Sequence, residues 1–87
     1  MNIEWVDKIV LDALKYTADI AGREVNETTK LMHTFDSTDF MVLNDVLYSK
    51  LRISLGDIGG IKPGDTPKTL SHRYSIKVMN MAEFRKS

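Results

Sequence analysis

Residues that could do acid–base chemistry are few in this chain. His33 and His72 are its two histidines, and histidine is the side chain whose ordinary pKa lies near neutrality. Ser71 directly precedes His72, but adjacent residues on a helix point about 100° apart, so this pair does not make a nucleophile with its base. His33 and Asp36 could form one edge of a metal site, but no second ligand motif accompanies them. We expect surface or capping roles for both histidines, and neither a metal nor a cofactor.

A pair of carboxylates, Asp36 and Asp39, flanks Ser37-Thr38. Paired carboxylates can act as general acid and base in hydrolases, so an enzyme that uses His33, Asp36 and Asp39 is one alternative. The pair directly precedes an apolar helical pattern, however, and the beginning of a helix favours side-chain acceptors and negative charge. We therefore interpret the two carboxylates as a helix cap and predict a protein that is not an enzyme.

A glycine-rich stretch runs from Gly56 to Thr66 and holds four of the five glycines. Such loops bind phosphate when bare backbone amides converge on it. Here no Gly-Lys-Ser/Thr follows, so the nucleotide-binding patterns do not fit. Gly56 and Gly59 match the GXXG spacing of KH nucleic-acid modules, but Pro63-Gly64 interrupts the helix that should follow at once. The stretch is interpreted as a structural loop.

The carboxyl-terminal segment is the best candidate for contact with nucleic acid. Binding to phosphates needs cationic side chains arrayed on one accessible face. On a helix, Lys68 and Arg73 would stand about 140° apart and Lys77 a further 40° round, so the charges are spread rather than striped. A nucleic-acid-binding accessory domain that uses Lys68, Arg73, Lys77 and Arg85 is therefore kept as the alternative function.

The strongest periodic signal predicts a helix from Asn2 to about Gly22, with Asn2 as its cap. Its apolar residues recur at spacings of three and four in two adjoining rows, so the apolar face is wide. The first row is Trp5, Ile9, Ala13, Tyr16 and Ile20, and the second is Val6, Val10, Leu14, Thr17 and Ala21. Opposite them lies a polar stripe of alternating sign, formed by Glu4, Lys8, Asp12, Lys15 and Asp19.

Three further helices are expected from spacing and caps. A short one is predicted over 27–35 after a cap at Asn26, and a long one over 38–55, ended by Gly56. Thr66-Pro67 looks like a cap followed by proline at the first helical position, which predicts a last helix to about Arg85. The segment Tyr74 to Met81 also alternates like a strand. The predicted fold is a single all-α domain over residues 1–87, a small three- to four-helix bundle with a Gly/Pro-rich loop before the last helix, and α+β is the alternative.

Composition bounds what a chain of 87 residues can do. The absence of cysteine excludes disulfides, thiol catalysis and zinc sites built on thiolates. The start of the chain is acidic and its apolar runs are short, so neither a signal peptide nor a membrane span is expected, and we predict a cytoplasmic protein. The 12 basic and 12 acidic residues cancel, but unevenly. Nine acidic and four basic residues give residues 1–48 a net charge of −5, and three acidic and eight basic residues give 49–87 a net charge of +5.

Several apolar residues lie off the faces that would form the core. Trp5 sits near the amino terminus, and Ile76 and Met79 lie off the Leu70/Tyr74 face of the last predicted helix. Aromatic and methionine-rich surfaces adapt well to partners. The sequence thus predicts a small regulatory or accessory protein that binds another protein or itself, as a possible homodimer, through Trp5, Ile76 and Met79.

Overall fold

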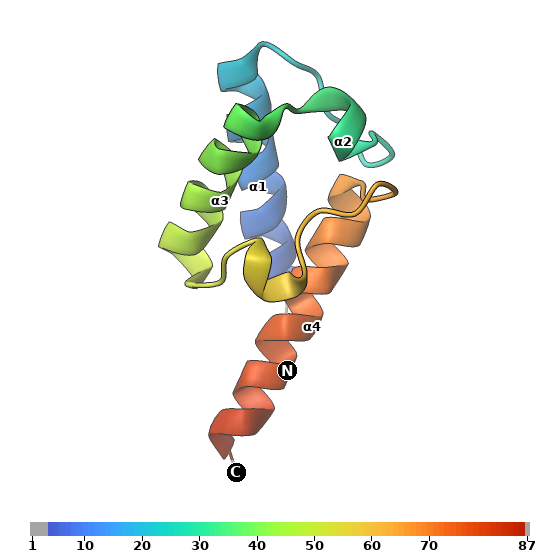
Figure 1. Ribbon diagram of the computed structural model, residues 1–87. Coiled ribbons are helices and arrows are strands. Elements are labelled where there is room, and N and C mark those ends of the chain that lie inside the picture. Colours follow the sequence, from blue (N-terminus) through green and yellow to red (C-terminus); the bar gives the residue numbers. More distant parts are fainter. Residues whose placement is uncertain (1–3, 87) are drawn as a thin grey trace.

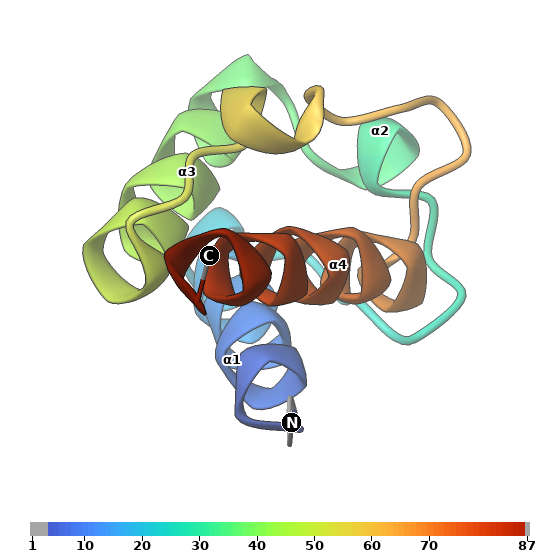
Figure 2. The same cartoon turned by 90° about the horizontal axis from the view of Figure 1, so that it is seen from below.

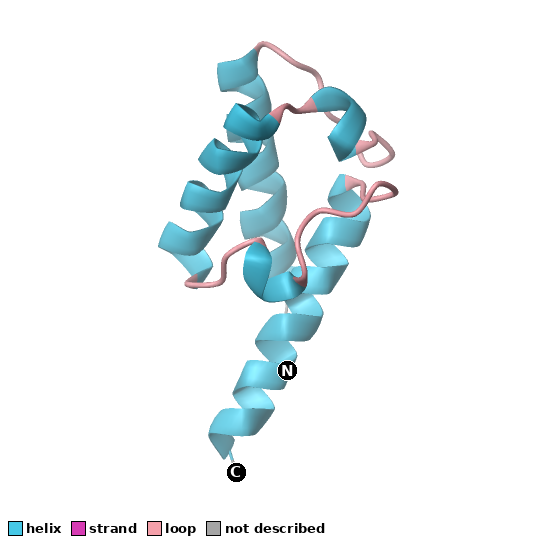
Figure 3. Cartoon of the chain, viewed as in Figure 1, coloured by secondary structure: helices cyan, strands magenta, loops and turns pink. Residues whose placement is uncertain are grey.

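The computed structural model describes the backbone of residues 4–86 and the side chains of 4–81. Within this range the chain forms four α-helices and one turn of 3-10 helix (Figures 1 and 3). They are α1 (Glu4–Ala21), α2 (Leu31–Thr34), α3 (Ser37–Leu51), η1 (Gly56–Ile58) and α4 (Pro67–Lys86). The all-α prediction is confirmed. The alternative strand over Tyr74 to Met81 is wrong, since these residues lie inside α4 and no strand occurs between residues 4 and 86.

Helix α1 is the central element of the bundle. It contacts both α3 and α4, which lie on different sides of it (Figures 1 and 2). Its second apolar row supplies the middle of the core, where Val6 and Val10 are fully buried beside Leu14 and Thr17. The predicted helix is therefore confirmed over Glu4–Ala21, while the predicted cap, Asn2, lies outside the described residues.

The segment between α1 and α3 is less helical than its sequence predicts. Only the single turn of α2 forms, because Asn26 does not cap a helix. Its side-chain oxygen instead accepts hydrogen bonds from the backbone N–H and the hydroxyl of Thr28, which closes a tight turn. The buried side chains of Leu31 and Phe35 then attach the segment to the core.

Helix α3 ends at Leu51, four residues before the predicted end. Arg52 takes a left-handed conformation (φ 59°) and its N–H bonds the Tyr48 carbonyl, which terminates the helix. The chain that follows is extended enough to bury Ile53 and Leu55, and the Asn44 side chain accepts a hydrogen bond from the Leu55 N–H. A continued helix would not allow both side chains to be buried. The free energy gained from their burial therefore outweighs the helical preference that the apolar spacing of 38–55 indicates.

Helix α4 begins as predicted. The Thr66 hydroxyl accepts a hydrogen bond from the Thr69 N–H, and Pro67 occupies the first helical position. The first half of α4 packs in the core through Leu70 and Tyr74, and the Tyr74 hydroxyl donates to the Ile53 carbonyl. The last turns extend beyond the other elements (Figure 1), so that the molecule measures 43 × 21 × 21 Å.

Candidate interaction surface

The two apolar rows of α1 have different surroundings. The second row is buried except for Ala21, which is partly exposed, whereas three large side chains of the first row are about half exposed: Trp5 (49%), Tyr16 (54%) and Ile20 (59%). Ile9, between them, is partly buried. At about 100° per residue, these four side chains fall within an arc of roughly 60° along the full length of the helix. They form an apolar strip, named here the α1 strip, with the buried Ala13 of the same row between Ile9 and Tyr16: Trp5, Ile9, Tyr16 and Ile20.

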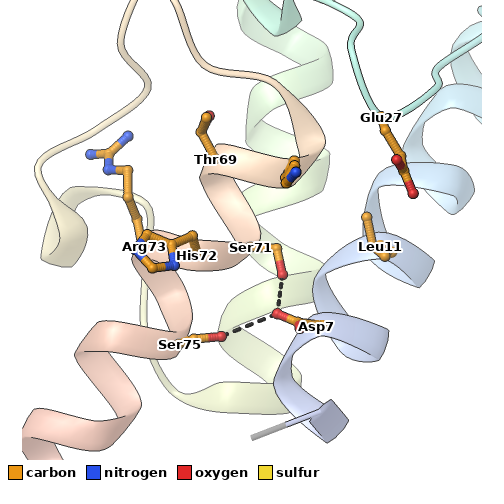
Figure 4. Close-up of a pocket in the computed structure, with 9 residues that line it drawn as sticks. Asp7, Leu11, Glu27, Thr69, Ser71, His72, Arg73 and Ser75 are labelled. Atoms are coloured by element: carbon orange, nitrogen blue, oxygen red, sulfur yellow. Dashed lines mark hydrogen bonds between the residues drawn. The ribbon is translucent and has the colours of Figure 1, made fainter.

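The α1 strip lies on the edge of α1 that faces away from α4. Asp7 marks the opposite edge, because its carboxylate accepts hydrogen bonds from the hydroxyls of Ser71 and Ser75 on α4 (Figure 4). Trp5 precedes Asp7 by two residues and therefore points about 200° away from it.

The three partner-binding residues that the sequence predicts do not share one surface. Ile76 and Met79 are 45% and 41% exposed, comparable to Trp5. Both lie on α4, the helix that packs against the Asp7 edge of α1, and Ile76 lines a shallow hollow of about 250 Å³ beside Arg73. Trp5 belongs to the α1 strip on the other edge. The predicted set therefore divides into one residue on the α1 strip and two on α4.

A groove separates α1 from the loop before α2 and from the start of α4. Two adjoining hollows, of about 680 and 690 Å³, share Asp7, Leu11 and Glu27 as lining residues (Figure 4). Leu11 is 37% exposed at this point. The groove is open, and its lining carries both carboxylates and lysines from α1, together with Glu27 of the loop and Lys68 of α4.

The serines, aspartate and histidine around this groove do not form a catalytic relay. A triad places histidine between the nucleophile and the acid. Here Ser71 and Ser75 donate directly to Asp7, and Ser71 and Ser75 are buried, so the carboxylate serves to satisfy two buried hydroxyls. His72 is exposed and lies on the same helix as both serines. The arrangement joins α1 to α4.

Asp36 and Asp39 form a helix cap, as their position before an apolar pattern indicates. The Asp36 carboxylate accepts from the Asp39 N–H at 2.9 Å, and the Asp39 carboxylate accepts from the Asp36 N–H at 3.1 Å. Asp39 also lies 3.8 Å from the Arg23 guanidinium. His33 is exposed on α2. Both carboxylates of the enzyme alternative are thus engaged in capping α3.

Arg73 is the centre of a clamp that sequence reasoning missed. Its guanidinium pairs with the buried Asp65 carboxylate and donates to the carbonyls of Ile58 and Gly60, at 2.6 and 2.7 Å. Asp65 in turn accepts from the Lys62 N–H and the Thr69 hydroxyl. These contacts therefore hold the glycine-rich stretch against α4.

The only sequence signal for this clamp is an aspartate directly before the Thr66-Pro67 helix start. Such an acid is normally read as part of the cap. The Asp65 carbonyl also accepts from the Leu31 N–H, so the same residue anchors α2. Gly59 and Gly60 both have positive φ, as the tight path of the loop requires.

The basic residues of the nucleic-acid alternative are separated in space. Arg73 is engaged by the clamp, and Lys68 and Lys77 lie on opposite sides of α4, about 180° apart. Lys77 lies close enough to Asp57 to help lower the pKa of that carboxyl, although hydrogen bonds from the backbone and hydroxyl of Ser54 lower it more. The side chain of Arg85 lies outside the described residues.

Within the described residues, no group of three or more histidine and carboxylate side chains is placed to hold a metal ion. Among the helices described between residues 4 and 86, none has the length and apolar character needed to cross a membrane.

Comparison with known proteins returned no matching family model, no matching curated protein and no matching solved structure.

Proposed function

We propose that this protein works by binding another protein chain through the α1 strip, as a regulatory or accessory component and not as a catalyst. The observation that carries this proposal is the exposure of Trp5, Tyr16 and Ile20 on one edge of the central helix. Single exposed apolar side chains are ordinary, but a run of large ones along one helix edge is typical of interaction sites. Tryptophan and tyrosine are also the residues most enriched at the energetic centres of interfaces.

The polar residues that could do chemistry support a role in binding rather than catalysis. Asp7, Asp36, Asp39 and Asp65 each accept hydrogen bonds from within the chain. These contacts hold helices and loops together, and they leave the carboxylates engaged in the fold. Trp5 and Tyr16, by contrast, are about half exposed and are not among the buried residues of the core.

Site-specific photocrosslinking in the cells that make the protein tests this proposal. A photoreactive phenylalanine analogue replaces Tyr16 on the α1 strip, and a control carries it at Met32, which is similarly exposed (47%) but lies on α2. We expect a discrete crosslinked species from position 16, absent or far weaker from position 32, and mass spectrometry identifies the chain that is captured. Equal crosslinking at both positions, or none at position 16, would refute the proposal.

A further inference from the structure

The α1 strip has a spacing that reads the same in both directions. Its members follow one another at intervals of four, seven and four residues: Trp5, Ile9, Tyr16 and Ile20. Two such helices that lie antiparallel about a two-fold axis bring each residue opposite its mirror position. Trp5 then faces Ile20 of the other copy, and Ile9 faces Tyr16, so each aromatic ring meets an aliphatic side chain. An isologous contact of this kind needs a surface complementary to itself.

The charges that border the α1 strip are also self-complementary. On the side of the strip away from the buried row, exposed residues follow at intervals of four, three and four with alternating sign, and the first three also line the groove: Lys8, Asp12, Lys15 and Asp19. Reversing this order exchanges every cation for an anion. In the antiparallel pair, Lys8 therefore lies opposite Asp19, and Asp12 opposite Lys15.

The apolar and charged patterns call for nearly the same alignment. The centre of the charged quartet lies one residue further along α1 than the centre of the strip, so aligning the strip displaces facing charges by two residues, about 3 Å along the helix axis. Lysine side chains span that difference easily. In a parallel pair about a two-fold axis, the charged quartets of the two copies would instead lie on opposite sides of the contact and could not meet. The sign pattern thus favours one orientation and one register, which is how electrostatic complementarity provides specificity.

Resting on the proposed function, we infer that the partner of the α1 strip is a second copy of this chain, bound antiparallel about a two-fold axis at α1. The 18 residues of α1 span about 27 Å, and a face about 10–12 Å wide offers roughly 300 Å² per copy. Stable complexes bury about 800 Å² per partner. The homodimer is accordingly expected to be weak and reversible.

Sedimentation equilibrium of the full chain between about 10 μM and 1 mM tests this pairing. The wild-type protein is expected to approach twice its monomer mass of 9.9 kDa as the concentration rises. Lys8→Glu introduces two like-charge pairs per dimer and should weaken association about tenfold, and Asp19→Lys should do the same. The double variant exchanges both partners and should recover association to within about threefold of wild type.

Control measurements separate the possible outcomes. Lys68→Glu reverses an exposed charge on α4, away from the α1 strip, and should leave association unchanged. Circular dichroism confirms that each variant is folded, and recovery in the double variant excludes misfolding as the cause of the single effects. A monomer at 1 mM, or a dimer indifferent to both single reversals, overturns the inference. If position 16 still crosslinks to a different protein, the proposed function stands while this pairing falls.

Discussion

The buried row and the α1 strip are two edges of the same helix with similar residue types and opposite surroundings. Val6, Val10 and Leu14 are at most 1% exposed, whereas Trp5 and Tyr16 are about half exposed. Measured round the helix, the second row spans about 80°, and the strip extends the apolar arc by a further 100° or so. A helix that needs only a core stripe has an apolar arc of about 100°. The apolar face of α1 is therefore wider than the core needs. The part that lies beyond the core is the surface available for association.

This difference shows that tertiary packing, rather than residue type, decides which apolar row of α1 is buried. Helices α3 and α4 lie on different sides of α1, and α4 approaches from the edge that carries Asp7 (Figure 2). The α1 strip contains larger side chains than the second row, yet it stays partly exposed because no third long helix packs on that edge within residues 4–86. The following changes should break or sharpen this contrast.

The largest effect is expected where the core is tightest. Leu14→Ala removes a side chain that is 1% exposed and should lower the free energy of unfolding by about 2–5 kcal/mol, through lost burial and the cavity left behind. Tyr16→Ala, two residues later on the α1 strip, should change it by about 0.5 kcal/mol or less. Urea denaturation of both variants at low micromolar concentration measures the difference. Equal losses would abolish the distinction between the two edges.

An intermediate effect is expected at the edge that faces α4. Asp7→Ala leaves the buried hydroxyls of Ser71 and Ser75 without their acceptor and should cost about 1–3 kcal/mol of unfolding free energy. Asp7→Asn keeps one acceptor oxygen and should retain most of that stability. The comparison uses the same denaturation experiment. If Asp7→Ala unfolds like wild type, α1 and α4 are joined by apolar packing alone.

A smaller effect at neutral pH is expected at Tyr74, whose side chain is fully buried in the core. Tyr74→Phe removes the hydrogen bond to the Ile53 carbonyl and should cost about 0.5–1.5 kcal/mol. Burial, with a smaller contribution from Asp57, raises the pKa of the Tyr74 phenol well above its ordinary value of 10. The unfolded chain therefore ionises first, so this residue's contribution to stability is complete below pH 10 and is lost as the pH rises above it.

The pH dependence provides the check on Tyr74. Thermal unfolding followed between pH 8 and about 11 should show wild type losing stability faster than Tyr74→Phe above pH 10, because phenylalanine has no proton to release. Tyr16→Phe, at an exposed position, is the matched control and should follow the wild-type curve. Parallel curves for wild type and Tyr74→Phe would contradict the burial of the phenol.

Local features of the fold could be predicted from the sequence because they depend on near neighbours. The spacing of apolar residues predicts α1, and the reciprocal Asp36–Asp39 cap and the Thr66-Pro67 start are recognisable within four residues. The all-helical class follows from these signals together. The width of the α1 face was also visible in the sequence, although nothing local says which of its two rows the other helices cover.

Features that depend on distant contacts could not be predicted. The end of α3 depends on where Ile53 and Leu55 are buried, and the helical spacing continues past that point. The clamp joins Arg73 to Asp65 and to two carbonyls of the glycine-rich stretch. The sequence suggests that this guanidinium could bind phosphate, but in the structure it is engaged by these contacts. The division between Trp5 on one edge and Ile76 and Met79 on α4 likewise depends on how the helices pack.

Trp5 allows the most direct measurement, because it is the single tryptophan of the chain and it belongs to the α1 strip. Acrylamide quenching of its fluorescence reports how far the ring is exposed. Burial of the strip in a homodimer predicts that quenching falls as the protein concentration rises from about 10 μM to 1 mM, and that Lys8→Glu shifts this change to higher concentration. Quenching that is the same at every concentration would contradict the account, because Trp5 would then remain exposed where association is expected.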